Sequence, residues 1–145
     1  MDDHRAGVVT AARSFGRVQR SRALPGMSVE EVLMPAGLSV AEHAHEDAQI
    51  CCVLEGEYLE RAGGRTWRLQ PGVTWFRPAR EQHSNRVSRD QDALTLLVSF
   101  ERQRFAAWER PGARPCLLSS LLLGEFRSGL IDELRRGDAG VALAL

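Results

Sequence analysis

Short runs of alternating apolar and polar residues fill the chain from about residue 14 to residue 101. The runs are separated by turn-forming pairs such as Gly63 with Gly64 and Pro71 with Gly72, because glycine and proline permit or fix the backbone angles of turns. Strands are predicted over residues 27–34, 37–43, 49–61, 65–70, 73–77, 83–88 and 93–101. Many short strands at this spacing favour an all-β sandwich or barrel over a parallel sheet with crossover helices.

The pattern changes after Pro111, where leucines recur at helical intervals over residues 116–126 and 128–136. Two short helices are therefore predicted there, and helices are expected only after Pro111. We expect a barrel domain over residues 1–110 and a helical extension over 111–145 that serves in dimerisation or as a linker. The apolar surface of these helices predicts a homodimer. The final GVALAL run either continues in a longer chain, which its abrupt end favours, or docks on the barrel.

Composition narrows the class of protein. A chain of 145 residues suits one domain, and its formal net charge of zero argues against nucleic-acid binding, which needs a clustered basic surplus. The sequence holds neither the apolar core of a signal peptide nor an apolar stretch of bilayer length, so a soluble cytoplasmic protein without a membrane partner is expected. The three cysteines, an odd number with two of them adjacent in an apolar run, suit buried reduced thiols.

Three of the four histidines form a spaced pattern. His43 and His45 alternate with Ala44, so on a strand they project from one face about 6.6 Å apart along the chain. Two such imidazoles can converge on one ion at about 2.0–2.1 Å, and His83 can join them from a distant strand. A single buried histidine is most often an ordinary core residue. Three at these intervals predict a divalent metal site, whose ion (zinc, nickel, iron, manganese or copper) the pattern does not distinguish.

The histidines stand within two longer motifs. These resemble the two motifs of the cupin superfamily, and the resemblance covers about residues 35–87. It implies a jelly-roll barrel, also called a double-stranded β-helix, with a metal held inside by four positions. Those positions are His43, His45, Gln49 and His83. The chain departs from the family pattern where Gln49 replaces the usual glutamate and Arg80 stands where glycine is common.

Gln49 changes the expected chemistry of the site. An amide oxygen is neutral, so the ion would keep its full double positive charge and attract an anionic ligand such as a carboxylate. The usual carboxylate, an obvious general base, is missing as well. Tyr58 or Glu60 on a predicted strand could approach the barrel interior in its place, but the two are taken as ordinary strand residues.

A second resemblance runs further along the chain. Residues 41–61, 69–87 and 124–145 look like the amino-terminal sensing region of AraC-type transcriptional regulators. That resemblance implies a small-molecule-sensing and dimerisation domain, and here no helix-turn-helix unit follows, so the chain itself is not expected to bind DNA. The alternative is a stand-alone metal-dependent cupin enzyme of dioxygenase or isomerase type. The long carboxy-terminal match favours the sensor.

Overall fold

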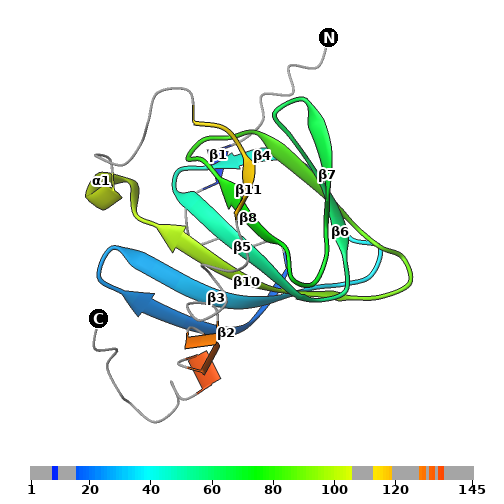
Figure 1. Cartoon of the computed structure of the whole chain (residues 1–145), viewed down its shortest axis with the longest axis horizontal. Helices are drawn as coiled ribbons and strands as arrows, with labels where there is room; N and C mark the ends of the chain where they lie inside the picture. Colours follow the sequence, from blue (N-terminus) through cyan, green and yellow to red (C-terminus); the bar gives the residue numbers. More distant parts are fainter. Residues whose placement is uncertain are drawn as a thin grey trace.

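The computed structural model describes residues 8–9, 16–105, 113–118, 128–129, 131–132 and 134–135. Within them the chain is almost entirely β-structure (Figure 1). The elements are β1 (Val8–Val9), β2 (Arg17–Leu24), β3 (Met27–Met34), β4 (Ser39–His45), β5 (Ala48–Glu55), β6 (Tyr58–Ala62), β7 (Arg65–Leu69), β8 (Thr74–Arg77), β9 (His83–Val87), β10 (Ala93–Phe100), α1 (Arg102–Phe105) and β11 (Cys116–Leu118). The all-β prediction is confirmed.

The strands form two sheets that enclose a barrel. One sheet has the order β1-β4-β9-β6-β7, and the other has the order β11-β8-β5-β10-β3-β2. The strands pair antiparallel except for β1, which runs parallel to β4. Consecutive strands often lie in different sheets, so residues far apart in the sequence meet inside the barrel. Figure 1 shows the two sheets facing each other around this interior.

Alternation along the strands decides which side chains enter the barrel. On β5, Gln49, Cys51 and Val53 are buried and face inward. The sequence predicts this direction, because the three share odd parity with His43 and His45 and one continued strand would point all of them inward. The chain does not run as one strand from His45 to Gln49, because residues 46–47 interrupt it and the chain crosses there from one sheet to the other. The predicted strand over 49–61 is likewise divided at Gly56, whose φ of 73° breaks the extended backbone.

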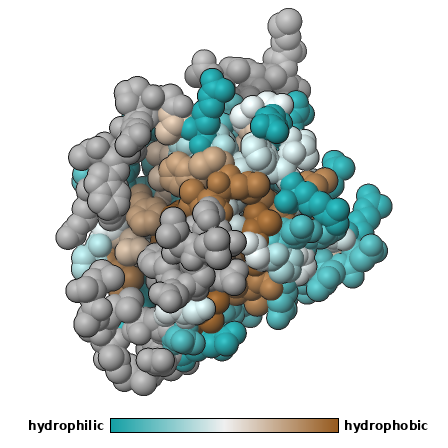
Figure 2. Space-filling view, viewed as in Figure 1, coloured by the Kyte–Doolittle hydropathy of each residue, from teal (hydrophilic) through white to brown (hydrophobic). Residues whose placement is uncertain are grey.

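The outer face of the six-stranded sheet carries a second apolar cluster. Val29, Leu96 and Val98 are almost fully buried there, and Leu134 packs against them from the carboxy-terminal segment. The described residues of that segment, 128–129, 131–132 and 134–135, are helical, as predicted. In Figure 2, hydrophobic residues gather in the middle of the face that is turned toward the viewer. The helical segment thus contributes to a core outside the barrel.

Two helix predictions are wrong. Residues 116–118 form β11 instead of the start of a helix, because they add a strand to the edge of β8, with Leu117 opposite Trp75. Residues 119–126 of that predicted helix lie outside the described part of the chain. The short α1 also precedes Pro111, where only strands were expected, and its first backbone N–H donates to the Asp47 carboxylate at 3.2 Å. That contact satisfies a donor which a helix start leaves free.

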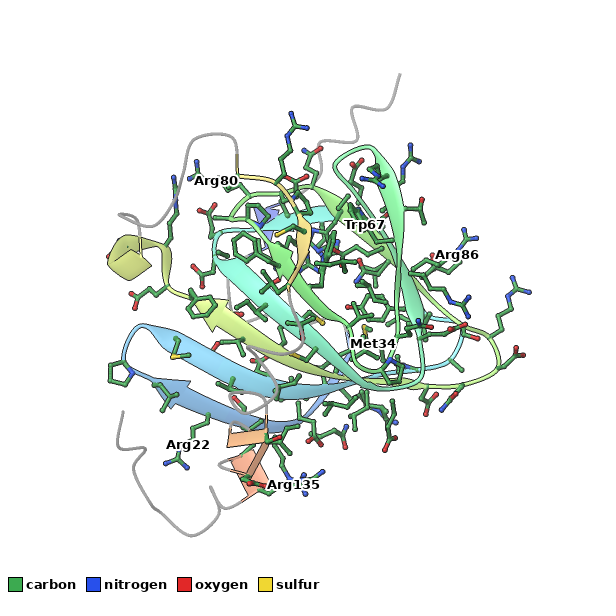
Figure 3. All side chains as sticks on the ribbon, in the orientation of Figure 1. Arg22, Met34, Trp67, Arg80, Arg86 and Arg135 are labelled. Carbon is green, nitrogen blue, oxygen red and sulfur yellow. The ribbon has the colours of Figure 1, made fainter. Side chains whose placement is uncertain are left out.

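In the described part of the chain, no helix is long and apolar enough to span a membrane. Charged side chains such as Arg80 and Arg86 are exposed and project from the barrel (Figure 3).

Candidate metal centre

Strands β4 and β9 bring the three histidines together. The register of this pair shifts between Val40, opposite Asn85, and His43, opposite His83, so three steps on β4 match two on β9. Such a β-bulge re-aims side chains and is common beside functional sites. It lets Val40 and His43 both face the interior although their positions differ in parity. Sequence alternation alone does not reveal this bulge.

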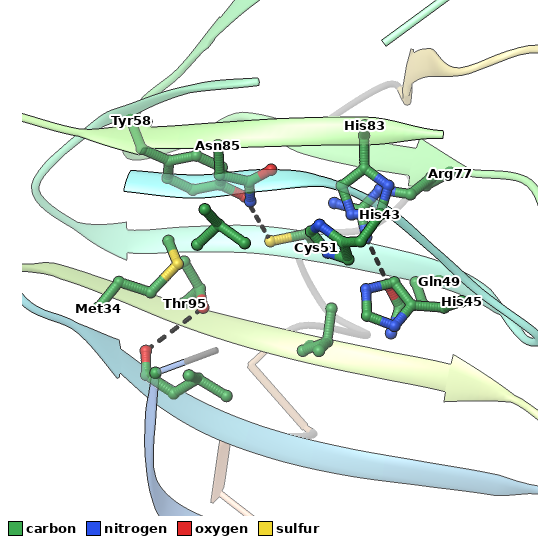
Figure 4. A pocket seen from close by; sticks show the side chains of 14 residues that line it. Met34, His43, His45, Gln49, Cys51, Tyr58, Arg77, His83, Asn85 and Thr95 are labelled. Atoms are coloured by element: carbon green, nitrogen blue, oxygen red, sulfur yellow. Dashed lines mark hydrogen bonds between the residues drawn. The ribbon is translucent and has the colours of Figure 1, made fainter. Parts of the chain in front are cut away.

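His43, His45 and His83, called here the histidine cage, converge inside the barrel (Figure 4). One ring nitrogen of each lies within 4.8 Å of the others, and all three side chains are buried. A tetrahedral ion with ligands at about 2.0–2.1 Å needs nitrogens about 3.4 Å apart. Small rotations of the rings would therefore close the cage around one ion, so the residues present fit a divalent metal.

Backbone carbonyls fix the tautomers of two cage histidines. Nδ1 of His43 lies 2.8 Å from the carbonyl oxygen of Ala41, and Nδ1 of His83 lies 2.9 Å from that of Glu81. A carbonyl oxygen can only accept, so each Nδ1 carries the proton and each Nε2 keeps its lone pair. This is the arrangement that metal-binding histidines use, because the outer hydrogen bond orients the ring and raises its basicity toward the ion.

The electrostatic environment keeps the cage neutral. Burial, followed by the positive charge of Arg77, lowers the pKa of His45 to about 4 and that of His83 to about 2. The pKa of His43 is also lowered, chiefly by burial. Near neutral pH the imidazoles are therefore neutral, with one nitrogen of each ring unprotonated, which is the form that ligates metals.

A buried ion pair lies beside the cage. Glu60 is fully buried, and its carboxylate accepts hydrogen bonds from Arg77 and from the indole N–H of Trp75. Arg77 also donates to the amide oxygen of Gln49, whose NH₂ donates to Ser99 at 3.1 Å. Every polar group in this chain of contacts has a partner, which is the condition for a stable buried network.

The ion pair presents its positive end to the cage. Arg77 depresses the pKa of all three histidines, whereas the opposing effect of Glu60 reaches only His43. Arg77 lines the cavity beside the cage and Glu60 does not, so the guanidinium group is the charge that faces the histidines. A positive group at this place favours anions beside the cage.

The cage opens into a small cavity of about 50 Å³. Its described lining includes apolar residues and Tyr58, Cys51, Asn85, Thr95 and Arg77, but no carboxylate. The Tyr58 hydroxyl and the Cys51 thiol lie 3.0 Å apart, and burial raises the pKa of Cys51 to about 12 and that of Tyr58 well above 10. Both groups therefore stay protonated.

The structure brings together all four residues that the sequence singled out, but Gln49 differs from the histidines. Its amide oxygen faces Arg77, so ligation through that oxygen would require the side chain to rotate. Tyr58 and Glu60, expected as ordinary strand residues, are instead fully buried parts of the site. Arg77 was missed. Its two-residue spacing from the buried Trp75 on one strand was the available signal, because both side chains then face inward.

The comparisons with known proteins now decide the family. A family model described as the cupin domain matches residues 29–100, about half of the chain. The chain contains a cupin domain. No curated protein matches the sequence significantly.

One of the similar solved structures supports the fold of the cupin domain. The cupin domain of Cnp3 from Schizosaccharomyces pombe aligns with a TM-score of 0.52 and 16% identity, over 68% of this chain and 75% of that one. The DMSP lyase DddQ from Ruegeria pomeroyi aligns with a TM-score of 0.48 and 26% identity, over 63% of this chain and 42% of that one. TT1209 from Thermus thermophilus aligns with a TM-score of 0.47 and 30% identity, over 52% of this chain and 72% of that one. This chain thus spans less than half of the lyase.

This cupin domain has Arg80 where the family motif commonly has glycine, and the backbone there keeps the conformation that suits glycine. Arg80 is the one non-glycine residue with positive φ in the described part of the chain, at 63°. Glycine is common at this place in the motif because it adopts such angles without strain. Arg80 holds the conformation through its backbone N–H, which donates to the carbonyl of His45 at 2.7 Å, and through its ion pair with Glu46.

Proposed function

We propose that this cupin domain binds one divalent metal ion through His43, His45 and His83 and holds a small anionic ligand beside it. The carrying observation is the convergence of three buried, neutral imidazoles, two of which carry their proton on Nδ1. When bound, the ion supplies a Lewis-acidic positive charge with coordination positions left for a ligand. Arg77 adds a second positive charge near the same place.

Gln49 remains a candidate fourth ligand in this proposal. Ligation through its oxygen would break the contact with Arg77, so three imidazoles are the simpler resting set. In that state the amide holds Arg77 and Ser99 in place and contributes no charge.

For the biological role, we propose the sensing and dimerisation domain of an AraC-type transcriptional regulator in the cytoplasm. Reversible binding is supported by the lack of a carboxylate in the described cavity lining and by the engagement of Glu60 with Arg77. The helical segment that packs Leu134 on the outer face of the barrel gives a physical link between ligand site and neighbouring domains. We expect a homodimer that does not itself bind DNA.

A stand-alone metal-dependent enzyme of dioxygenase or isomerase type is the second candidate. Three protein ligands leave positions at which a substrate can bind an ion, and that geometry favours this alternative. Among the described lining residues outside the cage, Cys51 and Tyr58 have pKa values raised far above neutral pH, so neither is a ready general base. Proton transfer by a side chain is therefore poorly supported.

One experiment separates the two roles. The metal-loaded protein is screened by thermal shift against small carboxylates, and a ligand at about 100 times its dissociation constant should add about 2.7 kcal/mol of stability. A stabilising acid is then incubated aerobically with iron-loaded protein. The sensor proposal predicts that the acid is recovered unchanged. Many turnovers per site, lost in His83→Ala, would establish the enzyme instead.

A further inference from the structure

A buried oxygen in the cavity lacks a partner. Oδ1 of Asn85 is the one buried side-chain polar atom without a hydrogen bond in the described part of the chain. Buried polar atoms are almost always paired, because an unpaired one loses its contacts with water and gains nothing. This atom therefore needs a donor that the described part of the chain does not provide.

The position of Asn85 connects this oxygen to the histidine cage. Asn85 follows His83 by two residues on β9, so both face inward, about 6.6 Å apart along the strand. It lines the same cavity as the cage. Figure 4 shows its amide between the Tyr58 ring and the histidines. A ligand held at the cage therefore lies within reach of Asn85.

The cavity limits the size of such a ligand. About 50 Å³ holds roughly four water-sized groups, which corresponds to a compound of four or five non-hydrogen atoms. A two-carbon acid with a hydroxyl group, together with a hydrogen bond of about 2.8 Å, has the right order of length between the cage and Asn85.

We infer that the cavity takes a short hydroxycarboxylate whose carboxylate lies at the cage and whose hydroxyl donates to Asn85 Oδ1. The place given to the carboxylate rests on the proposed function, and the place given to the hydroxyl group rests on Asn85. Asn85 is thus the specificity-determining residue. A site with a buried acceptor rejects an analogue that lacks the donor, because the acceptor then stays unpaired.

Glycolate and propionate test the inference, since they have the same number of non-hydrogen atoms and differ by a hydroxyl in place of a methyl group. Binding of both to the zinc-loaded protein is measured by titration calorimetry. We expect glycolate to bind at least about tenfold more tightly, a difference of about 1.4 kcal/mol. Asn85→Leu and Asn85→Ala should each bring the ratio close to one, with zinc content unchanged.

Thr95→Val is the matched control. Thr95 lines the same cavity, but its hydroxyl already donates to the backbone carbonyl of Val32 at 3.3 Å. This variant should keep the tenfold preference. Equal affinities in the wild type, no binding of either acid at tens of millimolar, or a preference that survives in both Asn85 variants would overturn the inference alone. Failure to bind zinc would overturn the proposed function and this inference with it.

Discussion

Replacing Arg77 by Met tests how strongly the buried ion pair supports the barrel. The substitution leaves the carboxylate of Glu60, which is 0% exposed, with the Trp75 indole as its remaining hydrogen-bond donor among the described residues. Removing one member of a buried pair costs about 3–5 kcal/mol, a large share of the stability of a single domain. With a urea dependence of about 2 kcal/mol per molar, the unfolding midpoint should fall by about 2 M. Tryptophan fluorescence during urea titration measures this shift.

The double variant Glu60→Leu with Arg77→Met separates loss of the pair from loss of packing. It removes both charges, so the remaining cost comes mainly from the unpaired oxygen of Gln49 and the unpaired indole N–H of Trp75, each about 1–3 kcal/mol. The double variant should therefore cost less than the two single variants together, with a coupling energy of at least about 2 kcal/mol. A cost below about 1 kcal/mol for Arg77→Met, or a double variant that costs as much as the two single variants together, would refute this reasoning.

Three further predictions follow from burial, backbone and charge. The metal-free protein should lose stability as the pH falls below 6.5, because His45 and His83, with pKa values lowered to about 4 and about 2, take up protons more readily in the unfolded chain. At pH 5 each histidine should lower the free energy of unfolding by about 2 kcal/mol, and unchanged urea midpoints from pH 7.5 to pH 5 would contradict this. Gly56→Ala should cost at least about 1–2 kcal/mol more than Gly64→Ala in urea unfolding. Both glycines have positive φ, but the added methyl group would lie 2.1 Å from a backbone carbonyl oxygen at position 56 and in open space at position 64. Leu134→Ala should lower the free energy of unfolding by about 2–3 kcal/mol, whereas Leu117→Ala should lower it by under about 0.5 kcal/mol, because Leu117 is 53% exposed. Equal costs would show that the helical segment does not pack on the outer face of the barrel.

Local patterns predicted the strands and the three histidines because alternation and turn residues act over a few positions. The inward direction of Cys51 and Val53 followed from the same rule. The cage itself depends on the bulge in β4, which arises from pairing with β9 and leaves no signature in the local pattern.

The rest of the site depends on contacts across the barrel. Glu60 and Arg77 are 17 residues apart and lie in different sheets, so nothing near either residue indicates its partner. The helix predicted from residue 116 failed for a similar reason, since the free edge of β8 outweighs the local preference of a leucine-rich run. The unpaired oxygen of Asn85 becomes visible only when all neighbouring groups are in place.

Metal content tests the central proposal most directly. Protein purified without affinity tag or added metal is stripped with chelator, incubated with zinc, dialysed and analysed by elemental mass spectrometry, alongside His83→Ala and the triple variant His43→Ala, His45→Ala and His83→Ala. Circular dichroism checks that the variants remain folded. We predict one zinc ion per wild-type chain, a large loss in His83→Ala and none in the triple variant. One ion per chain in a folded triple variant, or no ion in the wild type, would contradict the proposed metal centre.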